Sequence, residues 1–418
     1  MCTVFRFQRP FRLLPVVALL FAGSLSAQGL DFRAALSAAA QQAPALQARA
    51  ATLQGSTALQ TSAAELPDPK LSVGIDSLPI NGPDRGSLTR DNFTQRQIGW
   101  TQDVPNKAKR VARTDAAVAR AGRDQALLQM EQLAVRREAG LAWLAAYFAD
   151  KRLQLFEQLI AQQGLMRDTA NAQLAAGKIA PAEVTAIKLE VLALGDRRDE
   201  LQRDAQQANA MLRRWTGDAP ASKLSGDAPR LAVDRAYLEA NLERSPEIAA
   251  LIPMRAMADA DLREAEAAKN GDWSWGLRYG KRGPAYSDFV SVQLTFDLPL
   301  SVAKRQQPQV EARQKELIRV DAERDEVVKR QKQDLETQLS ELDAVNSRLN
   351  RLNQETLGLT AQKTALTLAA YESGRDKLAS VLEARKQQTE TSLRSLELQA
   401  RQLALQWRLN TIIPEQTP

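Results

Sequence analysis

Two stretches in the second half of the chain alternate large apolar side chains with small or polar ones. In residues 290–298, Val, Leu and Phe occupy every second position, and Ser, Gln, Thr and Asp occupy the positions between them. Residues 273–279 alternate in the same way, with Trp, Leu and Tyr as the large members. A period of two predicts β-strands with one apolar and one polar face. Because the surrounding chain is helical and mostly polar, such a face is typical of a transmembrane barrel strand that contacts lipid.

The first half of the chain carries a matching pair of short strands. Residues 71–75 and 97–101 alternate in the same way, and residues 79–92 between them are rich in Pro, Gly, Asn and Asp, which indicates a loop. The order of segments around the strands is also duplicated. The repeated segments are Asp103-Val-Pro105 with Asp297-Leu-Pro299, Ala108-Lys-Arg110 with Ala303-Lys-Arg305, and Ala175-Ala-Gly-Lys178 with Glu372-Ser-Gly-Arg375. This duplication predicts two structural repeats.

The predicted fold is mainly α with a small β part. Residues 1–27 are expected to be a signal peptide, followed by a first repeat over residues 28–229 and a second over residues 230–418. The first repeat would comprise a helix, a strand pair at 70–104, a long helical hairpin at 106–215 and a connector. The second would comprise a helix, a strand pair at 273–299, a long helical hairpin at 303–409 and a C-terminal tail.

The two helical arms are unusually long. Residues 106–175 and 303–371 contain little glycine and no proline after Pro308. A helix of about 70 residues is a rod of roughly 100 Å. Apolar residues at steps of three and four in 342–352 and 393–407 predict coiled-coil seams. A free soluble coiled coil would explain the arms, but it would not explain two strand pairs at matching positions.

The N-terminus has the pattern of a secretory signal. Three arginines precede an apolar run over residues 13–22, and small residues follow up to Ala27, where cleavage is expected. The apolar run is too short to span a bilayer as a helix. Removal of residues 1–27 lowers the net charge from +6 to +3 and removes Cys2, the only cysteine. The mature chain would therefore have no disulfide, and its small charge excess gives no reason to expect nucleic-acid binding.

The sequence offers little catalytic chemistry. It contains no histidine, which excludes a His-based triad, a His metal site and a His general base. No P-loop or paired-glycine phosphate motif occurs, and the scattered carboxylates fit solvated helix faces. Met254 and Met257, at helical spacing, fit packing better than a copper site. We therefore expect that the protein is not an enzyme and that it has neither a cofactor nor a metal site.

Taken together, these segments resemble the TolC family of outer-membrane channel proteins over nearly the whole mature chain. The resemblance rests on the two strand pairs, the junction Gln102–Arg110 and the turn Tyr371–Ala384. Family members have a Pro-x-x-Gly-Lys-Arg type of junction, in which Ala108 here replaces the glycine. Pro67–Leu71, Gly74–Pro79 and the junction look most like the heavy-metal branch with CzcC- and CusC-like channels.

The resemblance implies a homotrimer in the cell outer membrane with a long periplasmic extension. Each protomer would give four strands to a twelve-stranded barrel and its helices to a periplasmic tunnel. The expected partners are a periplasmic adaptor (membrane fusion) protein, an inner-membrane RND pump and outer-membrane lipid. The residues expected at the periplasmic tip, where the adaptor docks, are Gly177, Lys178, Gly374, Arg375, Asp376 and Lys377.

The strand pattern also assigns faces to individual residues. The expected lipid-facing residues are Trp100, Trp273, Trp275, Tyr279 and Phe296. Ordinary strand core is the alternative for the aromatic side chains among them. The expected lumen-facing residues are Asp76, Asp103, Arg278 and Asp297, where they would be hydrated and bias ion passage or have a purely structural role.

The predicted function is the outer-membrane channel subunit of a tripartite RND-type efflux system that exports heavy-metal cations. A drug-efflux or type I secretion channel is the alternative on the same fold. A periplasmic adaptor and a structural coiled coil are the alternatives from other classes. An adaptor would have one helical hairpin flanked by β-rich domains, whereas this chain has two hairpins and two strand pairs.

Overall fold

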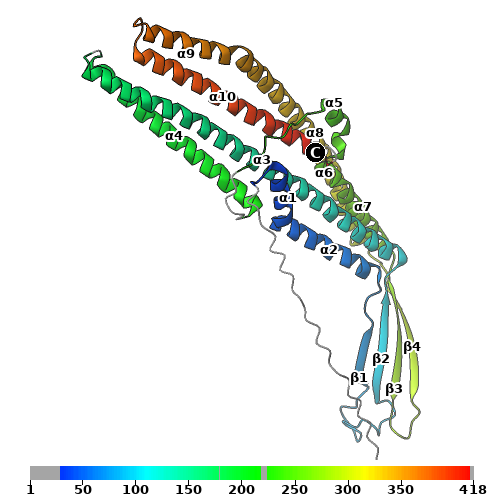
Figure 1. Ribbon diagram of the computed structural model, residues 1–418. Helices are drawn as coiled ribbons and strands as arrows, with labels where there is room; N and C mark the ends of the chain where they lie inside the picture. The colour runs from blue at the N-terminus through cyan, green and yellow to red at the C-terminus, as the bar shows by residue number, and fades with distance from the viewer. Residues whose placement is uncertain (1–28, 178, 218–223, 415–418) are drawn as a thin grey trace, which may run out of the picture.

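The chain folds into an elongated body with a small sheet at one end and long helical hairpins at the other (Figure 1). The computed structural model describes residues 29–177, 179–217 and 224–414, with the side chains of 162–167 not included. The predicted signal peptide and Lys178 lie outside these residues.

Four strands form one antiparallel sheet in the order β1-β2-β3-β4. The strands are β1 (Lys70–Asp76), β2 (Gln95–Val104), β3 (Trp273–Lys281) and β4 (Phe289–Phe296). β2 and β3 pair across the two halves of the chain, with Ile98 opposite Tyr279 and Val104 opposite Trp273. β1 and β4 are the outer strands, so within the described part of a single chain the outer edge of each has no neighbouring strand.

The helices continue from the sheet to the opposite end of the molecule. The first half contains α1 (Phe32–Gln42), α2 (Pro44–Ala64), α3 (Lys107–Ala175) and α4 (Pro181–Thr216). The second half contains α5 (Arg235–Asn241), the 3₁₀ turn η1 (Leu242–Arg244), α6 (Pro246–Ala249), α7 (Leu251–Ala267), α8 (Gln306–Arg351), the π-helical turn η2 (Leu352–Thr356), α9 (Leu357–Glu372) and α10 (Leu378–Asn410). None of the described helices combines the length and the apolarity that a membrane crossing requires.

The two long arms differ in detail. α3 is continuous over 69 residues, whereas the corresponding arm of the second half is interrupted by η2. Within η2, Asn353 Oδ1 accepts a hydrogen bond from the Ser395 hydroxyl of α10 at 3.0 Å. α8 begins at Gln306, three residues later than the sequence predicts, because the backbone N–H groups of Lys304 and Arg305 donate to the Ser301 carbonyl in turns at 3.0 and 3.1 Å.

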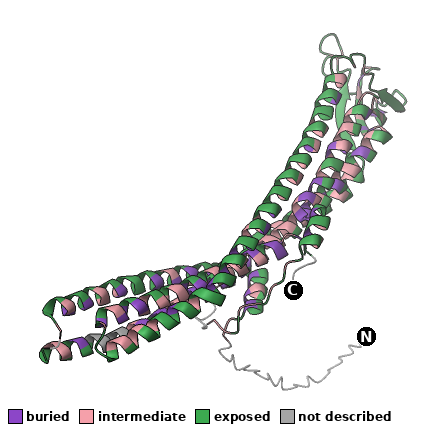
Figure 2. Cartoon of the chain, turned by 90° about the horizontal axis from the view of Figure 1, so that it is seen from above, coloured by how far each residue is buried: buried purple, intermediate pink, exposed green. Residues whose placement is uncertain are grey.

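The largest side chains of the core meet in the middle of the molecule. The Phe32 ring packs edge-on against Trp143 and Trp407, with ring centroids 5.4 and 4.9 Å apart. Each buried indole N–H is satisfied: Trp143 donates to the Leu30 carbonyl and Trp407 to the Arg137 carbonyl, both at 3.0 Å. Buried positions follow the inward faces of the helices, while the sheet is largely exposed (Figure 2). The helices thus form their own core, which leaves the sheet uncovered.

A hydrogen-bonded junction joins the helices to the sheet. Asn106 caps α3 by accepting from the Lys109 N–H at 2.9 Å, and its side-chain amide donates to the Ala267 carbonyl at the end of α7 at 3.0 Å. Asp272, directly before β3, accepts from the Asn106 N–H at 2.9 Å and pairs with Lys109 Nζ at 2.9 Å. Burial acts to raise the pKa of the Asp272 carboxyl, but these hydrogen bonds outweigh it and hold the pKa below its usual range.

Candidate functional site

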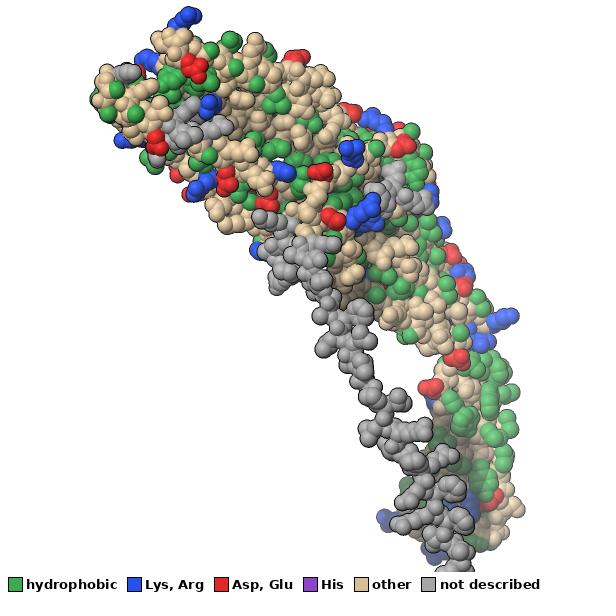
Figure 3. Space-filling model, viewed as in Figure 1, with side chains coloured by type: hydrophobic (Ala, Val, Ile, Leu, Met, Phe, Trp, Pro, Cys, Tyr) green, Lys and Arg blue, Asp and Glu red, His purple; other side chains and the backbone are tan. Residues whose placement is uncertain are grey.

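One face of the sheet is apolar from edge to edge. The register aligns its large side chains in rows, because Leu71 lies opposite Trp100, Trp100 opposite Leu277, and Leu277 opposite Val292. The predicted lipid-facing residues Trp100, Trp273, Trp275, Tyr279 and Phe296 all stand on this face. Their exposed fractions run from 37% for Trp275 to 61% for Phe296. Hydrophobic side chains gather over the strands in the space-filling view (Figure 3).

The opposite face of the sheet is polar. Gln97 Nε2 donates to Asp76 Oδ2 at 2.9 Å, and Lys70 Nζ pairs with Asp103 Oδ2 at 2.7 Å. Arg278 lies in the middle of this face, opposite Gly99 on one side and Ser291 on the other.

Gly99 and Asp297 each have close neighbours on or beside the polar face. A Cβ at Gly99 would lie 2.6 Å from Ser72 Oγ and 3.7 Å from Arg278 Cγ, so the glycine leaves room for both side chains. Asp297 falls one residue beyond β4, where its N–H donates to the Asp272 carbonyl at 2.8 Å. It therefore belongs to the sheet–helix junction as well as to the register of the polar face.

The far ends of the two hairpins turn at glycines. Gly177 and Gly374 have φ values of 70° and 72°, in the left-handed region that glycine occupies without steric cost. After α9, the Gly374 N–H donates to the Tyr371 carbonyl and the Arg375 N–H to the Ala370 carbonyl, at 2.9 and 2.8 Å. This pair of bonds is a Schellman motif, which ends the helix and reverses the chain.

The charged residues at the tip of the second hairpin differ in the bonds that their side chains form. Arg375 is exposed. Asp376 Oδ1 accepts from the Ser380 hydroxyl and from the Lys377 N–H, both at 2.7 Å, and these bonds hold the pKa of Asp376 below its usual range. Lys377 Nζ pairs with Glu183 at 3.0 Å. Asp376 thus stabilises the turn, and Lys377, although exposed like Arg375, is paired with α4.

The two hairpins are tied together near their tips. Gln173 Nε2 donates to the Tyr371 hydroxyl at 2.6 Å, which links α3 to α9. Further from the tips, Lys386 Nζ on α10 pairs with Glu190 on α4 at 3.0 Å, and the Glu190 carboxylate raises the pKa of Lys386. The sequence did not reveal these pairs, since their members lie far apart in the chain and within ordinary charged helix faces.

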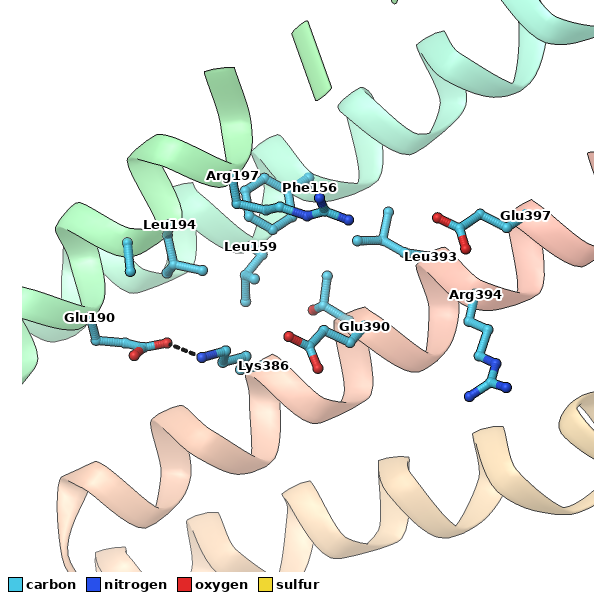
Figure 4. A pocket seen from close by; sticks show the side chains of 12 residues that line it. Phe156, Leu159, Glu190, Leu194, Arg197, Lys386, Glu390, Leu393, Arg394 and Glu397 are labelled. Atoms are coloured by element: carbon cyan, nitrogen blue, oxygen red, sulfur yellow. Dashed lines mark ion pairs between the residues drawn. The ribbon is translucent and has the colours of Figure 1, made fainter. Parts of the chain in front are cut away.

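A cavity of about 390 Å³ lies between α4 and α10 beside this ion pair (Figure 4). Its floor is apolar, formed by Phe156 and Leu159 from α3 with Leu194 and Leu393. Its rim carries both signs of charge, from Glu190, Arg197, Lys386, Glu390, Arg394 and Glu397. Across the described residues, no group of three or more His, Cys, Asp or Glu side chains could hold a metal ion. The cavity is a mixed-charge groove between the two hairpins.

No protein-family model and no curated protein matches the sequence. Solved structures match almost the whole chain. The outer membrane protein VceC of Vibrio cholerae is 16% identical with a TM-score of 0.74, over 90% of this chain and 94% of VceC. CusC is 15% identical with a TM-score of 0.76 over 98% of both chains. The MtrE outer membrane channel of Neisseria gonorrhoeae is 14% identical with a TM-score of 0.71, over 90% of this chain and 88% of MtrE. The chain therefore has the fold of TolC-like outer-membrane channels.

Proposed function

We propose that this chain is the subunit of an outer-membrane efflux channel in which three copies close one β-barrel and one helical tunnel. The observation that carries the proposal is the continuous, uncovered apolar face of the sheet. In water such a face would be a large exposed patch, which soluble monomers rarely tolerate. In a bilayer it contacts lipid, and the polar face lines a hydrated lumen.

The open edges of the sheet support closure between copies. β1 and β4 each have a neighbour on one side within the chain. Unpaired backbone groups on an edge strand are costly in hydrocarbon, so membrane strands occur in closed barrels. Four strands from each of three copies give twelve, an even number that closes with β1 of one copy beside β4 of the next.

The proposed orientation puts the helical tips in the periplasm. There the exposed Arg375 would contact a periplasmic adaptor, which would connect the channel to an inner-membrane RND pump. Charge reversal at Arg375 is expected to weaken cross-linking to that adaptor, because an attraction at the docking surface would become a repulsion. Unchanged cross-linking of R375E would remove Arg375 from the docking surface.

Membrane fractionation followed by chemical cross-linking tests the channel proposal. The protein is expected in the outer-membrane fraction, extracted only by detergent, with a cross-linked species of three subunits. Recovery of a monomer or dimer without detergent would overturn the proposal and favour a periplasmic adaptor or a structural coiled coil.

For the cargo, we propose heavy-metal cations, on the resemblance of Pro67–Leu71 and Gly74–Pro79 to the heavy-metal branch. Growth of a deletion strain across graded copper, silver, zinc, cobalt, cadmium and hydrophobic drugs tests this assignment. Sensitivity to metals alone, restored by the intact gene, is the expected result. Sensitivity to drugs alone would keep the channel and replace the metal cargo with drugs.

A further inference from the structure

The apolar face of the sheet ends at a pair of cations. Two residues beyond the pair Ile98 and Tyr279, the register places Arg96 opposite Lys281. Because side chains alternate between faces, Arg96 and Lys281 stand on the apolar face, at the end away from the helices. Both are exposed. The cations thus lie directly above the apolar band.

Among the described residues, no direct ion pair neutralises these two cations, although Lys281 lies near enough to Asp288 to interact with its charge. Like charges directly opposite each other destabilise an antiparallel strand pair. Within the described part of the chain, neither Arg96 nor Lys281 forms an ion pair with a carboxylate. Arg96 Nη2 donates to the Arg282 carbonyl at 3.5 Å, a contact that cancels no charge. On the polar face, by contrast, Lys70 is paired with Asp103.

The nearby carboxylate of Asp288 is already engaged. Its Oδ2 accepts from the Tyr279 hydroxyl at 2.5 Å, and its Oδ1 accepts from the Arg282 N–H at 3.2 Å. Arg282 itself stacks on Tyr286 and Phe289, with its guanidinium carbon 5.7 and 5.4 Å from the ring centroids. Arg96, Lys281 and Arg282 thus outnumber the carboxylates at this end of the sheet, Asp288 and Asp76, and Asp76 belongs to the polar face.

We propose that Arg96 and Lys281 bind the phosphate of an anionic lipid in the outer leaflet. The proposal rests on the membrane placement argued above. A planar guanidinium beside a compact ammonium suits a phosphate, which accepts several charge-assisted hydrogen bonds. Basic side chains at the edge of an apolar band lie at the headgroup level.

The neighbouring side chains favour a lipid over free phosphate. Ile75 lies opposite Arg96, and Ile98 is two residues further along β2 on the same face. Both isoleucines are about half exposed, at 52% and 48%. A lipid whose phosphate is held by the cations would therefore lay its acyl chains along an apolar surface. A free anion has no acyl chains and would leave that surface uncovered.

Native mass spectrometry of the full-length protein in detergent tests the site, with bisphosphorylated lipid A and phosphatidylcholine as competing lipids. A basic residue near an anionic lipid surface strengthens binding about fivefold, so R96Q/K281Q is expected to reduce lipid A binding roughly 30-fold. The matched control R85Q/R90Q removes two charges from the 77–94 loop at the same end of the sheet. Because Arg90 is already paired with Asp84, the control should reduce lipid A binding clearly less than R96Q/K281Q does.

The outcomes separate this inference from the channel proposal. Equal loss in both double variants, or none in R96Q/K281Q, would overturn the phosphate site while leaving the channel intact. Displacement of lipid A by millimolar inorganic phosphate would replace the lipid with a free anion and overturn the proposal as well. A protein that retains neither lipid would instead contradict the membrane placement.

Discussion

Gly140 sets how closely α3 and α10 approach in the middle of the molecule. A Cβ at this position would lie 2.3 Å from Trp407 Nε1, so Gly140→Ala must displace the buried indole. We expect a loss of about 1–3 kcal/mol in the free energy of unfolding, the usual cost of overpacking. Gly195→Ala on α4 is the control, because a Cβ there meets no atom within 4 Å. The control should gain up to about 1 kcal/mol in thermal unfolding experiments; equal effects would contradict the packing argument.

Asp272 makes the sheet–helix junction sensitive to acid. Its folded-state pKa is lowered, so its contribution to stability is complete above its ordinary pKa of 3.8 and disappears as pH falls through the folded value. We expect Asp272→Asn to lower the free energy of unfolding by about 2 kcal/mol at pH 7. The difference from wild type should shrink below about pH 4. A difference that is constant from pH 7 to pH 3 would exclude the carboxylate as its source.

The sequence predicted least about contacts of this kind, in which one side chain meets a residue that is distant in the chain. The alternation of strand residues placed Trp100 and Trp275 on one face without any knowledge of the fold. Nothing near Gly140 indicates that Trp407 packs on it, because the contact depends on how two distant helices cross. The same holds for the partners of Lys377 and Lys386.

At the level of elements, the sequence was informative where its signals are local. Period-two alternation predicted the strands, and the scarcity of proline and glycine predicted the long arms. The π-helical turn η2 was not predicted, since residues 352–356 (Leu-Asn-Gln-Glu-Thr) contain neither proline nor glycine. The start of α8, three residues later than predicted, also lacks a local signal: Asn106 caps α3 with its side chain, whereas Arg305, which precedes α8, forms no side-chain cap.

The ion pair between α4 and α10 links the two hairpins of the chain. Lys386→Glu would place a carboxylate beside Glu190 and Glu390 and is expected to push the hairpins apart. If the protein forms the proposed channel, planar-bilayer recordings should show a higher single-channel conductance for K386E. The charge swap E190K/K386E should return the conductance to that of wild type, because the pair is restored with opposite polarity. Identical conductance in all three proteins would show that the pair does not restrain the tunnel.

At the scale of the proposed trimer, Arg278 would recur three times at one level of the lumen. Twelve strands spaced about 4.8 Å apart and tilted about 40° close into a barrel of roughly 12 Å radius. That radius is comparable to the screening length of about 10 Å at 0.1 M salt, so the three charges would influence ions across the lumen. We expect Arg278→Glu to shift the reversal potential in a salt gradient toward cation selectivity. Arg278→Lys should leave it unchanged, and an equal shift in both variants would contradict a charge effect.

The order of strands in the sheet has a consequence for inheritance. β1 comes from the first quarter of the chain and β4 from its last third, so every seam of the proposed ring joins an early strand of one copy to a late strand of the next. A copy in which β4 alone is disrupted, for example by proline in place of Val292, would still offer β1 to a neighbour but could not complete its own seam. One such copy would prevent closure of the ring that it joins. The yield of intact channels would therefore fall roughly as the cube of the fraction of copies that are intact. An allele that disrupts β4 alone is therefore expected to be dominant over the intact gene, whereas a complete deletion would be recessive.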